Sequence, residues 1–166
     1  MHALPRTGLL SFFYAHDEEG ESFWQDPDYV RAYHFAEIET LQSRETPAAV
    51  RLGATMRVAL TADVDVPPWP WDQSALARWP TAESMRDAYW EFRSELHPTG
   101  AYLLGYPFNT TLAYDPTPGP DWCSLLTLPS NDDLEWSWHD GDYLVAFIEK
   151  ERLRQREFSR IKADAG

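Results

Sequence analysis

The sequence predicts an α+β protein with a largely antiparallel sheet, one main amphipathic helix over about residues 81–96 and a short C-terminal helix. Strand-like runs follow one another without the regular strand–helix alternation of parallel sheets. The aromatic content, eight each of Trp, Tyr and Phe, favours a β-rich core. Proline, glycine and aspartate clusters separate the runs, most clearly at residues 115–121. The 166 residues are expected to form a single domain over 1–166.

Six segments are predicted as strands: residues 8–14, 29–35, 51–65, 122–128, 135–138 and 143–148. The run at 8–14 is apolar and aromatic, as expected of a buried strand. Within 51–65, the alternation of Met56 and Val58 with Arg57 is typical of a half-buried strand. Between the last two runs, the pair Asp140-Gly141 favours a type I′ hairpin turn, in which both central residues need positive φ.

Two helices are predicted. In the first, Thr81 is a candidate N-cap and Pro98 prevents continuation. Its apolar positions form one stripe, which we expect to pack on the sheet: Met85, Ala88, Tyr89, Phe92 and Leu96. The second helix is predicted over residues 149–161, and the tail after it is expected to fray.

The charge narrows the choice of partners. The chain has 27 acidic and 14 basic residues and a net charge of −13. Phosphate binding rests on basic surfaces, so DNA, RNA and anionic membranes are disfavoured and a basic protein partner is favoured. No membrane-length apolar run and no signal peptide are readable, so a cytoplasmic location is expected.

The aromatic residues allow two interpretations. Most are expected in the core, whereas some could line a ligand groove or anchor an interface. Residues 67–71 contain three prolines in four positions, which bar a helix and a central strand. Trp69 and Trp71 are therefore predicted to be exposed on a stiff, extended segment.

Sequence support for catalysis is absent. The only cysteine, Cys123, lies in a predicted strand, where an inert buried thiol is the usual outcome. The acidic segment 131–142 lacks the spacing of a calcium loop, and the five histidines show no metal-ligand spacing. Glu135 and Asp140 could form the acid and base of a glycosidase, but no pattern fixes their separation. No metal site and no cofactor are predicted.

Several short motifs occur together in order along the chain. They are Leu-Gly-Tyr-Pro at 104–107, Leu-Leu at 125–126 with a polar turn at 130–133, Trp-His-Asp-Gly at 138–141, Phe-Ile at 147–148 and Phe-Ser at 158–159. In this order they resemble the YwqG-like family of bacterial proteins, a domain of unknown function. The Phe-Phe strand at 8–14 resembles an internal strand of that family, so the chain looks N-terminally shortened. Thr111 and Thr127 stand near positions where the family tends to carry glutamine.

The resemblance implies a mixed α+β fold and no established reaction. Neighbouring toxin genes in such families suggest an immunity-like, partner-neutralising role. Two functions remain open: a non-catalytic module that binds a basic protein, or a small-molecule-binding protein or hydrolase with an aromatic and acidic pocket. The candidate binding residues are Tyr106, Trp122, Trp138, Asp140, Trp69 and Trp71.

Overall fold

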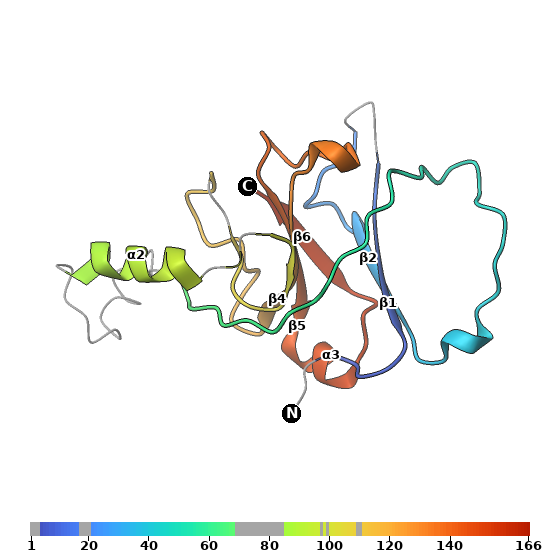
Figure 1. The fold of residues 1–166 in the computed structure, drawn as a ribbon, viewed down its shortest axis with the longest axis horizontal. Coiled ribbons are helices and arrows are strands. Elements are labelled where there is room, and N and C mark those ends of the chain that lie inside the picture. Colours follow the sequence, from blue (N-terminus) through green and yellow to red (C-terminus); the bar gives the residue numbers. More distant parts are fainter. Residues whose placement is uncertain (1–3, 17–20, 69–84, 97, 99, 109–110) are drawn as a thin grey trace.

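Two antiparallel sheets pack against each other in the computed structural model, which describes residues 4–16, 21–68, 85–96, 98, 100–108 and 111–166 (Figure 1). One sheet pairs β1 (Leu9–Tyr14) with β2 (Val30–Phe35). The other has the order β3-β4-β5-β6, formed by β3 (Tyr102–Leu103), β4 (Trp122–Pro129), β5 (Tyr143–Glu149) and β6 (Ile161–Ala165). The helices are α2 (Arg86–Leu96), α3 (Lys150–Gln155) and the 3₁₀ turns η1 (Ile38–Thr40) and η3 (Asp132–Leu134). The predicted α+β class is confirmed.

The core lies between the two sheets. On β2, Val30 and Ala32 point inward, and each belongs to one of two clusters of buried apolar residues. A β-bulge between Ser124 and Leu126 adds one residue to β4. Leu125 and Leu126 are consecutive, yet both are buried, each in one of these clusters. The bulge thus lets neighbouring leucines of β4 pack against the same two-stranded sheet.

Glycine is required where the first sheet begins. Gly8 has a φ of +93°, and a Cβ there would lie 2.2 Å from the carbonyl oxygen of Phe35. That oxygen belongs to the paired strand, because Leu9 stands opposite Phe35 in the register. A side chain at position 8 would therefore push the strands apart.

Two predicted strands are wrong. Residues 51–65 form no strand in the described structure and run as an extended, exposed segment. Alternation reports which side chains share a face, but a strand also needs a neighbour that offers backbone hydrogen bonds. The run at 135–138 makes only an isolated bridge, between Asn131 and Trp136. The turn after it has positive φ at His139 and Gly141 rather than at Asp140, so it is not type I′.

The main helix does not pack on the sheet as predicted. In the described structure α2 begins at Arg86 and projects away from both sheets, and Thr81 lies outside the described residues (Figure 1). Met85 and Phe92 are exposed, whereas Arg93 is buried and donates from Nε to the Val66 carbonyl at 3.4 Å. The helix is therefore attached to the segment before it through polar contacts. No described helix is long and apolar enough to cross a membrane.

The C-terminal prediction is partly wrong. The helix is shorter than expected, and the segment after it is β6 rather than a frayed tail. Arg156 adopts a left-handed conformation (φ +60°) and ends α3, which lets the chain turn back along β5. Ala163 and Ala165 are buried in the core, Ala165 with only 1% of its surface exposed. The small side chains of this segment allow the close approach of β6 to β5.

Candidate functional site

Tyr106 and Trp122, two of the predicted site residues, line one hollow of about 660 Å³. Tyr106 follows β3, where positive φ at Leu104 and Gly105 turns the chain. Trp122 is the first residue of β4 and also lines the hollow. The Lys150 ammonium donates to the Pro120 carbonyl at 2.6 Å and adds a basic group to the rim. The lining also includes Asp115, so the arrangement offers two aromatic rings, one ammonium group and one carboxylate to a small molecule.

Trp122 also contacts a residue of β6, the edge strand of the four-stranded sheet. The Lys162 ammonium lies 4.8 Å from the centroid of its indole ring, a cation–π contact. Both residues line a second hollow, of about 440 Å³. Trp122 thus stands between two depressions of the surface, and its ring is held by a neighbouring charge.

Cys123 lines the first hollow but is not activated. Burial raises the pKa of its thiol, which Lys150 and Arg154 only partly oppose. Its Sγ donates to the Ile148 carbonyl at 3.7 Å. A nucleophilic cysteine needs a lowered pKa, so this thiol serves packing. Within the described residues, no group of three or more His, Cys, Asp or Glu side chains could hold a metal ion.

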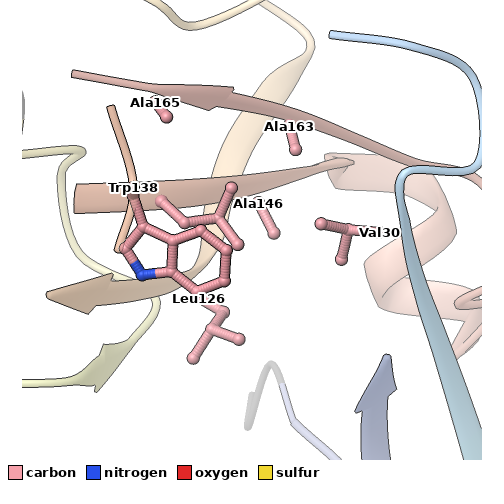
Figure 2. Packing of buried hydrophobic residues seen from close by; sticks show 7 residues of the cluster. Val30, Leu126, Trp138, Ala146, Ala163 and Ala165 are labelled. Atoms are coloured by element: carbon pink, nitrogen blue, oxygen red, sulfur yellow. The ribbon is translucent and has the colours of Figure 1, made fainter. Parts of the chain in front are cut away.

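Trp138 lies in the core rather than in a pocket. Only 3% of its surface is exposed, and it packs among Val30, Leu126, Ala146, Ala163 and Ala165 (Figure 2). The ring centroid of Tyr14 lies 4.9 Å away in an edge-on arrangement. Its indole Nε1 is buried and has no hydrogen-bond partner among the described residues. The structure therefore separates Trp138 from Tyr106 and Trp122.

The other predicted residues lie elsewhere. Asp140 is in an exposed turn, where its carboxylate is 3.7 Å from His139 Nδ1, and 91% of its side chain is accessible. Glu135, weighed as its catalytic partner, is bound 3.5 Å from Arg51. Trp69 and Trp71 lie outside the described residues. The six candidates thus do not form one site in the described structure.

A polar network at β6 was missed by the sequence analysis. The buried Asp164 accepts from the Tyr114 hydroxyl at 2.9 Å and from Gln25 Nε2 at 3.1 Å. Burial, followed by the hydrogen bond to Asp164, raises the pKa of Tyr114. The three residues are far apart in sequence, and Asp164 was expected in a loose tail, so no local pattern could have joined them.

An exposed aromatic face was also missed. The outward positions of β1 and β2 carry Leu9, Phe13, Tyr33 and Phe35, hereafter the aromatic face. The Phe13 and Tyr33 rings lie 5.8 Å apart, and Tyr33 stacks on Phe35 at 6.4 Å. The prediction of a buried strand at 8–14 is only partly right: alternate residues such as Leu10 and Phe12 face the core, whereas Leu9 and Phe13 are exposed. Alternation from Leu9 to Phe13 was the available signal.

These features define an α+β protein with two packed antiparallel sheets and surface hollows lined by aromatic residues. Residues 1–164 match the family described as a domain of unknown function (DUF1963), and the chain belongs to that family. No curated protein matches the chain.

Proposed function

We propose that this chain is a protein-interaction module that captures a basic partner on the aromatic face. The exposure of that face supports the proposal most directly: 54% of Phe13 and 44% of Tyr33 are accessible. Adjoining large apolar groups on a surface mark interaction sites, and aromatic residues dominate binding energy at interfaces. The inner side of the same sheet is committed to the core.

The acidic charge of the molecule favours a basic protein as the partner. Acidic residues adjoin both ends of β2: Asp28 before it, and Glu37 and Glu39 after it, all exposed. On the face itself, Arg31 is paired with Asp28 at 3.4 Å. With a net charge of −13, the molecule attracts basic proteins over long range and repels acidic ones. The partner's site is thus an apolar patch ringed by Lys and Arg.

The resemblance to the YwqG-like family supports the same proposal and suggests the type of interaction. In a partner-neutralising role of the immunity type, in the cytoplasm of a bacterial cell, the acidic molecule would bind a basic protein through this surface. The aromatic face would then cover a functional surface of the basic partner.

Capture from a lysate of the source cells, followed by titration of the captured protein, tests the proposal. The Phe13→Ser/Tyr33→Ser double variant is expected to bind at least about thirtyfold more weakly, because losing even one central aromatic residue of an interface costs on the order of 2 kcal/mol and such losses are not additive. Phe92→Ser removes an equally exposed ring on α2 and is the matched control. Wild-type binding should weaken with salt. Equal affinity of the double variant, or binding that salt leaves unchanged, would refute it.

A small-molecule-binding function is the second candidate, because Tyr106 and Trp122 line one hollow. Its volume lies within the range of ordinary ligand pockets. A metabolite screen by thermal shift should then give a stabilising ligand whose effect disappears in Trp122→Ala. Lack of any shift would remove this candidate.

A further inference from the structure

The extended segment 51–66, hereafter the strap, has the side-chain pattern of a strand and no strand beside it. Its even positions carry Leu52, Met56, Val58, Leu60 and Val64. These side chains are exposed, Val58 and Leu60 each to 77%. Odd positions carry Thr55, Arg57, Thr61 and Asp63. An extended chain would therefore present one continuous apolar face and one polar face.

The strap is fixed at both ends and unpaired between them. At its start, Arg51 Nη1 lies 2.6 Å from His16 Nε2. At its end, the Asp65 carboxylate accepts the backbone N–H of Tyr106 at 2.7 Å. Among the described residues, 52–64 make no backbone–backbone hydrogen bond. Exposed, unpaired extended backbone is a template for pairing with another strand.

An apolar hollow of about 990 Å³ lies under the strap. Met56, Val58 and Leu60 line it from the strap, and Leu126, Leu128 and Trp136 line it from the sheet side. Figure 1 shows the strap, in green, crossing the molecule before it reaches α2. If a second strand paired with the strap, its apolar side chains would lie on the same face and could also enter this hollow.

The charges of the strap indicate which strand would pair with it. Arg57 and Asp63 have no ion pair among the described residues, and they lie on the same polar face, three residues either side of Leu60. An antiparallel pair of identical straps centred on Leu60 places each Arg57 opposite an Asp63. Val58 then stands opposite Ala62, and Met56 opposite Val64, all on the apolar face. A parallel pair would instead put Arg57 beside Arg57, which is unfavourable.

We propose that the chain forms a symmetric dimer in which the straps of two copies pair antiparallel around Leu60. Antiparallel pairing of identical segments is twofold symmetric, as the commonest dimers are. The Arg57–Asp63 ion pair forms twice across the axis, once on each side of Leu60, and the apolar side chains of both straps are covered together. The strap shares no residue with the aromatic face, so the dimer does not depend on the proposed function.

Sedimentation velocity of the full chain over a range of concentrations tests the dimer. It is run at physiological ionic strength, which screens the repulsion between two acidic copies. Arg57→Asp and Asp63→Arg are each expected to weaken self-association at least about tenfold, because each variant puts two like-charge pairs in place of two ion pairs. Arg44→Asp makes the same charge change at an exposed site outside the strap and should leave association unchanged.

Mixing the two charge variants gives the sharper result. A mixed dimer of Arg57→Asp with Asp63→Arg regains an opposite charge at every pair, so the mixture should associate about as well as wild type. Hydrogen exchange at every second residue within 52–64 should slow as the wild-type concentration rises, since alternate amides of an antiparallel pair gain partners on the other strand. A wild-type monomer at all concentrations, a mixture that stays monomeric, or a dimer in which 52–64 exchange as fast as in the monomer would overturn the proposal.

Discussion

Replacing Trp138 separates a core role from a binding role. The sequence made this residue a candidate for ligand contact, whereas the structure buries all but 3% of its surface. Burying an indole removes on the order of 200 Å² of apolar surface from water, or roughly 5 kcal/mol at 25 cal/mol per Å². Measured losses for large aromatic residues replaced by Ala are about 3–5 kcal/mol, so we expect Trp138→Ala to lower the free energy of unfolding by about 4 kcal/mol.

Thermal and urea unfolding of the full chain measure this loss. For a chain of this size, 4 kcal/mol corresponds to a fall in Tm of roughly 8–16 °C. Trp138→Phe should lose less, about 1–2 kcal/mol, because it keeps most of the ring and removes an indole N–H that has no partner among the described residues. Trp90→Ala is the control, since Trp90 is exposed on α2 and contacts the Arg93 guanidinium.

The control should change stability by less than about 1 kcal/mol, the value of an exposed cation–π contact. A Trp138→Ala variant as stable as Trp90→Ala would refute the buried position of Trp138. Loss of ligand binding with unchanged stability would restore the role predicted from the sequence.

Three further outcomes follow from local geometry. Burial raises the pKa of Tyr102 to about 12, so its neutral form stabilises the fold below pH 10. This stabilisation is lost between about pH 10 and 12, where only the unfolded state ionises. Since Tyr102 is partly exposed, we expect wild type to lose about 1–2 kcal/mol of stability relative to Tyr102→Phe in urea titrations over this range. Parallel pH profiles of the two proteins would contradict this. Gly105→Ala should lower stability by about 1–3 kcal/mol, because φ is +73° and the new Cβ would lie 2.7 Å from the Asp65 carboxylate. Gly100→Ala, which meets nothing within 4 Å, is its control, and equal Tm values would argue against the turn at Gly105. Asn131→Ala should cost about 1 kcal/mol in unfolding experiments, since its side chain accepts the Leu134 N–H at 2.9 Å and caps η3; an unchanged midpoint would show that this bond is not formed.

Local sequence patterns predicted the strands that were bounded by clear turn signals. The runs at 29–35, 122–128 and 143–148 agree with β2, β4 and β5 to within about one residue. Proline and glycine punctuation at 115–121 correctly marked the loop before β4. In each case the apolar run and its breakers lie within one short window, so no distant contact was needed to recognise the element.

The candidate site was less accessible to sequence reasoning. Tyr106 and Trp122 face one hollow because the chain turns at Gly105 and returns through the 115–121 loop. Trp138 carries the same type of side chain, but it belongs to the core. Residue type identifies a tryptophan, whereas its exposure depends on which strands are stacked over it.

The sequence by itself determined the α+β class, the acidic surface and the positions of the central strands, because composition and periodicity act locally along the chain. Tertiary structure alone decided that α2 projects from the sheets, that 161–165 forms an edge strand and that 51–65 is left without a neighbour. These outcomes depend on which segments reach each other's backbone groups. Hydrogen-bond partners far along the chain leave no periodic mark in the sequence, so only the assembled fold reveals them.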